Sequence, residues 1–146
     1  MINPRLRQCR ESDIRAVMNR DGATIDIDRT ILQMHSGLSF AAEVEGVVIG
    51  CAGVVIPWPG VGVCWMMLAK EAERYVLWLT RTTKRILADL CRAFGLHRLE
   101  AIALKDSDRN QRWFRALGFT IEQQGTARAY FSDKRSVVRF ERIMEG

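Results

Sequence analysis

The chain has 146 residues, of which 48% are hydrophobic and 27% are charged, and this composition excludes a disordered protein. At this length a hydrophobic core forms without support from disulfides or metals, and we predict a single domain over residues 1–146. The 22 Lys and Arg residues outnumber the 17 Asp and Glu residues, and the net charge of +5 permits a nucleotide phosphate, a nucleic acid or an acidic protein as partner without choosing between them.

The cysteines and histidines do not follow a metal-binding pattern. The cysteines are Cys9, Cys51, Cys64 and Cys91, and no two of them have C-x-x-C spacing. His35 and His97 lie far apart in the sequence, so we expect no metal site. We expect free, buried thiols in a reducing cytoplasm, although Cys51 and Cys64 could face each other across a hairpin.

Residues 47–69 carry no charge and form the only candidate membrane span in the sequence. Pro57 and Gly60 interrupt this run and three other glycines dilute it, so two buried strands explain it better and we expect no membrane partner. Residues 1–10 combine charge with no apolar core, and we expect no secretory signal there.

The N-terminal part of the chain predicts a strand and two helices. The strand is expected over residues 6–10, and the first helix over 12–20 with Ser12 as its N-cap. The second helix is expected over 26–36 and ends before Gly37. Its inward-facing positions are expected to be Ile27, Ile31 and Met34.

Three strands are predicted next. Residues 39–45 alternate between apolar and polar, Glu45 and Gly46 form a turn, and residues 47–56 return as a buried strand, which together indicate a β-hairpin. A second turn at 57–60 leads into a strand over 61–68, which is rich in residues that favour β structure.

Residues 71–94 predict a long helix that ends before Gly95. The apolar positions on its inner side are Val76, Leu79, Thr83, Ile86, Leu87, Leu90 and Phe94. On the opposite side Arg74, Arg81, Arg85 and Arg92 lie within about 40° of one another, joined by Lys84. A solvated outer face is the simpler interpretation of this arginine row. A surface that follows a phosphate backbone is the alternative, but no nucleic-acid motif or interleaved aromatic residue accompanies the row, so nucleic acid is the least favoured partner.

The C-terminal part predicts alternating strands and one helix. We expect a strand over 98–105, a helix over 107–117 with Ser107 as N-cap, a strand over 119–123, and an antiparallel pair formed by 130–131 and 137–143.

Two segments give this order of elements a family resemblance. Residues 113–119 read Trp-Phe-Arg-Ala-Leu-Gly-Phe and resemble the aromatic-x-x-x-Gly-Phe ending found in GNAT N-acetyltransferases. Residues 6–14 resemble the first strand and helix start of the same family. The resemblance covers nearly the whole chain and implies an α/β (α+β) GNAT-like fold, a mixed and mostly antiparallel sheet flanked by helices, with two splayed central strands.

The resemblance also implies a cofactor, acetyl-CoA, bound between the strands at 61–68 and 99–105. The cofactor-binding residues that it implies are Met66, Met67, Leu68, Arg74, Ser107, Asn110 and Phe114. The main-chain N–H groups of the first three would face the thioester and the oxyanion formed when it is attacked. The alternative is that the side chains around Met66 are simply part of the core.

The chain departs from the family pattern where the pyrophosphate should bind. No glycine occurs between Gly62 and Gly95, the stretch in which the family places a glycine-containing loop. Side chains as large as Leu77 and Trp78 could block the phosphates. Arg74 and the helix N-terminus could still hold them through charge and the helix dipole.

The general acid and base are not evident either. Phe114 occupies the position where many family members carry a tyrosine, and a phenyl ring cannot donate a proton. Glu43 and Glu45 are expected on one face of their strand, and either of them or His35 could act as base. Solvated surface roles explain all three more simply, so the catalytic residues are unknown from the sequence.

The resemblance leaves two functions open. The first is an acyl-CoA-dependent N-acyltransferase that acetylates a small-molecule or protein amine. The second is a catalytically inactive GNAT-like module that binds a protein, because the glycine loop and the tyrosine are missing. Residues 60–120 also resemble short acetyltransferase-like proteins of tailed phages, which would place the chain in a host cytoplasm or a virion. A homodimer is compatible with either function.

Overall fold

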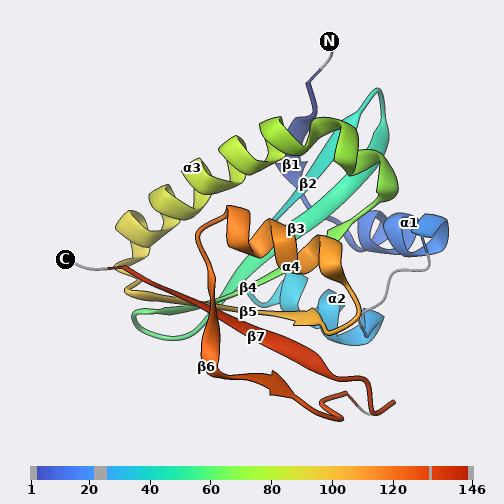
Figure 1. Ribbon diagram of the computed structural model, residues 1–146. Coiled ribbons are helices and arrows are strands. Elements are labelled where there is room, and N and C mark those ends of the chain that lie inside the picture. Colours follow the sequence, from blue (N-terminus) through green and yellow to red (C-terminus); the bar gives the residue numbers. More distant parts are fainter. Residues whose placement is uncertain (1–2, 22–25, 132, 145–146) are drawn as a thin grey trace. The chain divides into compact units, whose positions relative to one another are not determined.

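The computed structural model describes residues 3–21, 26–131 and 133–144 (Figure 1). The strands are β1 (Arg5–Gln8), β2 (Leu38–Val44), β3 (Val47–Trp58), β4 (Val61–Leu68), β5 (Arg98–Leu104), β6 (Thr120–Ala127) and β7 (Val137–Ile143). The helices are α1 (Glu11–Asp21), α2 (Ile27–His35), the 3-10 helix η1 (Lys70–Tyr75), α3 (Val76–Phe94) and α4 (Asp108–Ala116). None of these helices has the length and hydropathy needed to cross a lipid bilayer.

The described strands form a sheet in the order β1-β2-β3-β4-β5-β7-β6. The pair β4–β5 is parallel, whereas β1–β2, β2–β3, β5–β7 and β6–β7 are antiparallel. The predicted α/β class with a mixed, mostly antiparallel sheet is therefore confirmed.

The chain divides into two compact units, which are described separately below. Unit 1 comprises residues 1–55 and 65–82, and unit 2 comprises residues 56–64 and 83–146. The strands β3 and β4 and the helix α3 each contribute residues to both units.

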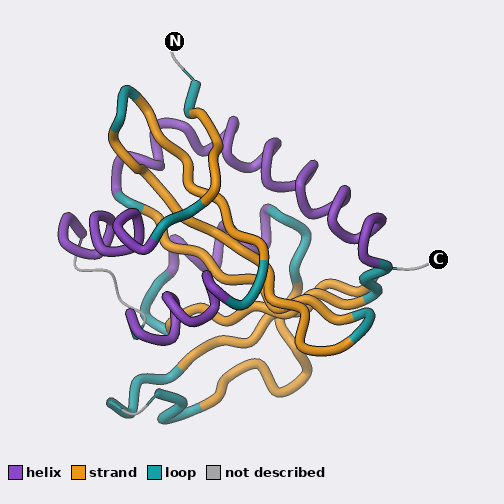
Figure 2. Tube along the Cα trace, turned by 180° about the vertical axis from the view of Figure 1, so that it is seen from behind, coloured by secondary structure: helices purple, strands orange, loops and turns teal. Residues whose placement is uncertain are grey.

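Unit 1 has a core between its strands and the helices α1 and α2. Ile14 of α1 is fully buried, and it belongs to one apolar cluster with Met34 of α2 and Trp65 of β4. Ile27 and Ile31 pack against this cluster, so the inner positions predicted for the second helix are confirmed. Figure 2 shows α1 and α2 next to each other, and α2 contacts β2.

The two helices of unit 1 begin with acidic caps. Asp26 precedes α2, and its carboxylate accepts hydrogen bonds from the N–H groups two and three residues further on, at 3.0 and 3.3 Å. In α1 the carboxylate of Asp13 accepts from the N–H of Arg10 at 2.8 Å, the reciprocal half of a capping box. The prediction of Ser12 as N-cap is therefore wrong, because the helix already begins at Glu11 and Ser12 lies within it.

The hairpin β2–β3 forms at the predicted turn. Glu45 and Gly46 have φ angles of 50° and 81°, and two successive positive φ angles match the twist of the flanking strands. The strand β2 ends at Val44, so the prediction that places Glu45 on the strand beside Glu43 is wrong.

Unit 2 is organised around an aromatic cluster beneath α4. The ring of Phe114 lies 5.4 Å from that of Phe119 and 5.5 Å from that of Phe140 on β7, between ring centroids. The side-chain amide of Gln111 donates to the carbonyl oxygens of Leu104 and Lys105, and so fastens the start of α4 to the end of β5. Figure 1 shows α4 lying along these strands.

The long helix predicted over 71–94 forms in two parts. The 3-10 helix η1 comes first, and α3 begins at Val76. Leu79 is buried as predicted, but Val76 and Phe94 are 46% and 51% exposed. The buried stripe is shorter than expected, and among the η1 residues only Ala72 is buried, so little packing holds that turn in α-helical geometry.

The predicted C-terminal strand pair is wrong in one member. Tyr130 and Phe131 lie in a turn, where both of their N–H groups donate to the carbonyl oxygen of Arg135, at 2.9 and 3.2 Å. The strand predicted over 119–123 is longer instead, and β6 runs to Ala127 and pairs with β7.

Candidate functional site

The first candidate segment is the second half of β4, in unit 1. The parallel ladder between β4 and β5 begins at the pair Val61–Arg98 and ends at the pair Cys64–Ala101. All the residues of this ladder belong to unit 2, whereas residues 65–68 of β4 belong to unit 1.

The side chains of this segment are buried, as the core interpretation predicts. Met66 and Met67 are 5% and 4% exposed, and Met67 belongs to the apolar cluster of unit 1. Their main-chain groups have a separate role. The N–H of Ala69 donates to the carbonyl oxygen of Ile49 on β3 at 2.9 Å. Because main-chain direction alternates along a strand, the N–H of Met66 points away from β3.

Trp65 adds a buried polar group that sequence analysis missed. Its indole Nε1 is buried and has no hydrogen-bond partner among the described residues. The nitrogen lies where a side chain at Gly53 would be, 2.6 Å from the position that a Cβ would take. Only glycine at position 53 leaves room for the indole ring. The sequence alone does not indicate this, because it does not show that Gly53 on β3 lies beside Trp65 on β4.

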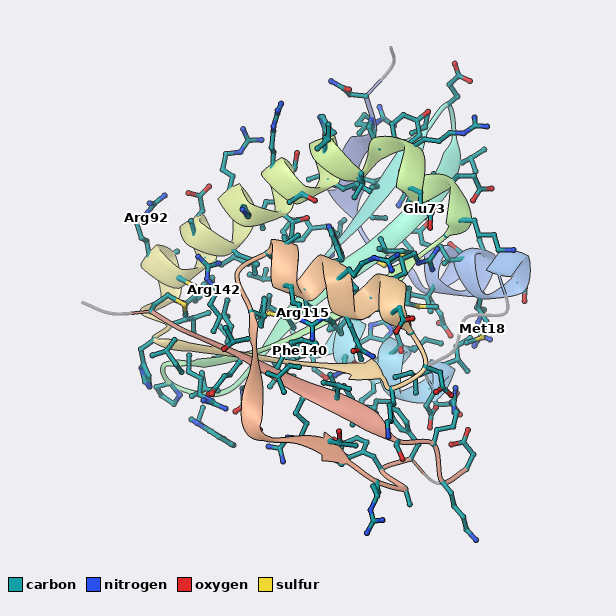
Figure 3. The ribbon with its side chains drawn as sticks, viewed as in Figure 1. Met18, Glu73, Arg92, Arg115, Phe140 and Arg142 are labelled. Carbon is teal, nitrogen blue, oxygen red and sulfur yellow. The ribbon has the colours of Figure 1, made fainter. Side chains whose placement is uncertain are left out.

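The second candidate segment is η1 and the start of α3, where the cofactor phosphates were expected. Lys70, Glu71, Glu73 and Arg74 are all exposed, so two carboxylates stand among the cations here. Figure 3 shows Glu73 on this turn, ahead of α3. Leu77 is 72% exposed and points into solvent, so it does not fill the core. The turn has no glycine and no excess of positive charge, and it does not fit a pyrophosphate group in the manner of a glycine loop.

The third candidate segment is the start of α4, in unit 2. Ser107 occupies the N-cap position as predicted, but its side chain makes no capping hydrogen bond. Asn110 is 8% exposed, and its Oδ1 is buried without a partner among the described residues. An orphaned acceptor can accept from a ligand N–H or from a water molecule.

Phe114 does not take part in proton transfer. It is 3% exposed and packs edge-to-face on Phe119 and against Phe140. The position is a core position of unit 2, and the absence of a hydroxyl group there follows from its packing.

The carboxylate of Glu43 is held by two arginines and is a poor base. Arg7 donates to Glu43 through Nε at 3.0 Å, and Arg5 also donates to it. These hydrogen bonds lower the pKa of Glu43, so the carboxylate has little tendency to accept a proton. Arg7 binds Asp13 as well, through two hydrogen bonds of 2.7 and 2.8 Å, and these lower the pKa of Asp13 in the same way. The four side chains join β1, α1 and β2, so their role is structural.

The other candidate bases lie on the surface of unit 1. Glu45 is exposed in the hairpin turn, and His35 is exposed in the last turn of α2. No described contact brings either of them to β4.

Three of the four thiols are poor nucleophiles, whereas the hydrogen bond with Cys51 lowers the pKa of the buried Cys9. Burial raises the pKa of Cys64 to about 12 and also raises the pKa of Cys91. The pKa of Cys51 is raised by its hydrogen bond with Cys9 and by burial. All four cysteines are free, and the described residues contain no group of three or more His, Cys, Asp or Glu side chains that could hold a metal ion.

Comparisons with known proteins bear on the fold. No family model and no curated protein sequence matches the chain. Solved structures match over almost its full length. They include IAA acetyltransferase from Bacillus cereus (15% identity, 97% of this chain and 100% of the other, TM-score 0.73). They also include Ard1 from Thermoplasma volcanium (15% identity, 99% and 100%, TM-score 0.77). A third is a GNAT family acetyltransferase from Elizabethkingia anophelis with acetyl-CoA bound (11% identity, 99% and 100%, TM-score 0.72). At these identities the match shows a shared fold, and the predicted GNAT-like fold is confirmed.

Proposed function

We propose that this chain is an N-acyltransferase that takes its acyl group from a coenzyme A thioester. The observation that carries the proposal lies within unit 1, where the hydrogen bond from the N–H of Ala69 to the carbonyl oxygen of Ile49 shows that the N–H of Met66 points away from β3. The shared fold supports the proposal, because solved acetyltransferases have the same architecture, but a fold alone does not determine a reaction.

The main chain of β4 supplies the chemistry in this proposal. The N–H of Met66, which points away from β3, would donate to the thioester carbonyl and to the oxyanion that forms on it. One such donor typically contributes about 3–4 kcal/mol to transition-state stabilisation. The amine nitrogen attacks the thioester carbon, the C–S bond breaks, the coenzyme A thiolate leaves, and the proton that the nitrogen loses passes to solvent water. No side chain is assigned as acid or base.

The thioester end would bind more strongly than the phosphate end. In η1 the exposed cations Lys70 and Arg74 flank the exposed carboxylates Glu71 and Glu73. The charges of this turn therefore cancel, and they attract an anionic pyrophosphate only weakly.

Release of coenzyme A tests the proposal. Purified protein is incubated with millimolar acetyl-CoA and a panel of small amines and peptide N-termini, and the free thiol is measured with a chromogenic disulfide. We expect amine-dependent thiol release and a matching mass gain of one acetyl group on the amine. Absence of thiol release with every amine, together with absence of binding heat from acetyl-CoA, would overturn the proposal.

A second function is favoured by a different observation. Phe114, at the position where many GNAT proteins carry a tyrosine, is part of the aromatic core, and Glu43, a candidate base, is neutralised by two arginines, so both side chains serve stability. A catalytically inactive GNAT-like module that binds a protein would show this pattern. It predicts no change in melting temperature with acetyl-CoA, whereas the acyltransferase predicts a rise.

A further inference from the structure

The net charge of the chain is not shared between its two units. Unit 1 holds nine Lys and Arg residues against nine Asp and Glu residues. Unit 2 holds 13 Lys and Arg against eight Asp and Glu, so it carries the whole net charge of +5. The surface of unit 2 is therefore where a polyanion would be attracted.

The cations on one face of the sheet in unit 2 are already neutralised. Arg98 forms ion pairs with three carboxylates, including Glu100 at 3.0 Å and Glu122. Arg139 pairs with the second oxygen of Glu122 at 3.0 Å. Two arginines are matched there by three glutamates, so this face attracts no anion.

The helices of unit 2 present a different surface. Lys84 and Arg85 on α3 and Arg112 and Arg115 on α4 are exposed. Within the described ranges none of these four side chains forms an ion pair or a hydrogen bond. We call them the helical basic surface. Arg92 on α3 is paired with Asp89 and projects away from the helix in Figure 3, so it is not counted.

Arg142 of β7 lies near both helices. Phe140 of β7 contacts Phe114 of α4, and Arg142, two residues further on, points to the same face. The Nε of Arg142 lies 3.3 Å from the position that a Cβ at Gly118 would take, just past α4. The same guanidinium opposes the rise in the pKa of Cys91 on α3, so it lies near both helices. The unpaired cations of α3 and α4 are thus on one side of unit 2.

The residue types on and around this surface favour one class of binding partner. No large apolar side chain is exposed between residues 83 and 93 of α3 or along α4. Protein interfaces rely on buried aromatic anchors, and membrane-bound helices insert an apolar face, so neither partner is favoured.

Three of the four cations are arginines, whose planar guanidinium binds phosphate oxygens in pairs. Single strands bind through stacked aromatic side chains, which are absent here, whereas a duplex offers its phosphates without them.

We propose that the helical basic surface binds the phosphate backbone of double-stranded nucleic acid without reading its sequence. The inference does not depend on the acyltransferase activity. About four phosphate contacts predict that log K falls with log salt concentration with a slope of roughly −3.6. They also predict a dissociation constant in the micromolar range at low salt.

Fluorescence anisotropy with a labelled 20-base-pair DNA duplex tests the proposal over a series of salt concentrations. We expect the double variant Lys84→Gln/Arg85→Gln to bind about tenfold more weakly at the lowest salt concentration and to reduce the slope by about 2. Arg112→Gln/Arg115→Gln should have the same effect. Circular dichroism and urea denaturation establish that each variant is folded.

A matched control separates a defined surface from bulk charge. Arg10→Gln removes one exposed cation of unit 1 that has no ion pair among the described residues, and we expect it to bind the duplex within twofold of the parent protein, whereas Arg85→Gln alone should bind about threefold more weakly. An equal loss in this control would overturn the proposal, as would the absence of duplex binding at low salt. Binding to anionic lipid vesicles that depends on the same four residues, without duplex binding, would assign the surface to membranes and would also overturn it.

Discussion

The two units stabilise their helices by opposite means. In unit 1 a chain of charges, Arg5–Glu43–Arg7–Asp13, connects the edge strand β1 to β2 and to the first turn of α1. In unit 2 the rings around Phe114 hold α4 against β7 without any charge. Glu43, one of the candidate bases, and Phe114, at the position where many GNAT proteins carry a tyrosine, are thus both part of the stabilising structure. Neither Glu43 nor Phe114 is therefore assigned a part in proton transfer.

The two units also differ in whether their cations are paired with carboxylates. Unit 1 pairs Arg5 and Arg7 within its own structure, whereas Lys84, Arg85 and their neighbours on unit 2 face solvent unpaired. The salt bridges of Arg5 and Arg7 are thus part of the fold, whereas the four cations of the helical basic surface are available to a partner.

The largest expected effect concerns the aromatic cluster. Phe114→Ala should lower the free energy of unfolding by about 3–5 kcal/mol, because it removes a ring that is 3% exposed and leaves a cavity. The control is Phe94→Ala, whose ring is 51% exposed, and it should cost less than about 1 kcal/mol. Urea denaturation measures both. Similar losses in the two variants would show that Phe114 is not a core residue.

A smaller loss is expected from the charge chain in unit 1. Arg7→Met should cost about 3 kcal/mol, because it leaves the carboxylate of Asp13, whose side chain is 6% exposed, without its partner. Arg5→Met should cost less than about 1 kcal/mol, because the Arg5 side chain is 78% exposed. If both variants lose equally little stability on chemical denaturation, Asp13 does not depend on Arg7.

Acid should weaken unit 1 through the same carboxylate. The pKa of Asp13 is lowered in the folded state, chiefly by the hydrogen bonds from Arg7. Its contribution is therefore complete above the unfolded pKa, near 4, and is lost as pH falls through the folded pKa. The effect should be smaller than that of Arg7→Met, because acid neutralises the carboxyl group that the substitution leaves charged. Urea midpoints measured from pH 6 to pH 2.5 should fall less steeply in Asp13→Asn than in the parent protein, and parallel curves would contradict this.

The smallest effects are expected at two hairpin glycines, one in each unit. Gly46 has a φ of 81° and open space around it, so Gly46→Ala should cost about 1 kcal/mol from backbone strain alone. Gly60 has a φ of 89°, and a Cβ there would collide with the ring of His97, so Gly60→Ala should cost more. In a His97→Ala background the two glycine substitutions should cost the same. A difference that persists in that background would mean that the ring is not the cause.

The sequence predicts most of the elements because local patterns determine them. The glycines at 46, 95 and 118 have positive φ angles where turns were expected, and residues 61–68 form β4 with the predicted bounds. Helix starts were harder, because the cap of α1 depends on Asp13 reaching back to Arg10 and not on the residue type at Ser12.

The site could not be predicted to the same extent because it depends on contacts between distant residues. Glu43 looks like a free strand carboxylate until Arg5 and Arg7 are placed beside it, 36 or more residues away in the sequence. The orphaned Nε1 of Trp65 depends on Gly53 in a neighbouring strand, and the orphaned Oδ1 of Asn110 depends on the packing of α4. No local sequence pattern indicates that a buried polar atom will lack a hydrogen-bond partner.

A comparison of two ligands tests the central claim most directly. Isothermal titration calorimetry is carried out with acetyl-CoA and with S-acetylpantetheine, which carries the same thioester and amides but no phosphate. Both ligands should bind, because both carry the thioester. Their dissociation constants should lie within about tenfold of each other, a difference of about 1.4 kcal/mol, because η1 lacks a glycine loop and places Glu71 and Glu73 among its cations, so the phosphates add little affinity. Failure of both ligands to bind at millimolar concentration would contradict the account, and so would acetyl-CoA binding more than a hundredfold tighter than S-acetylpantetheine.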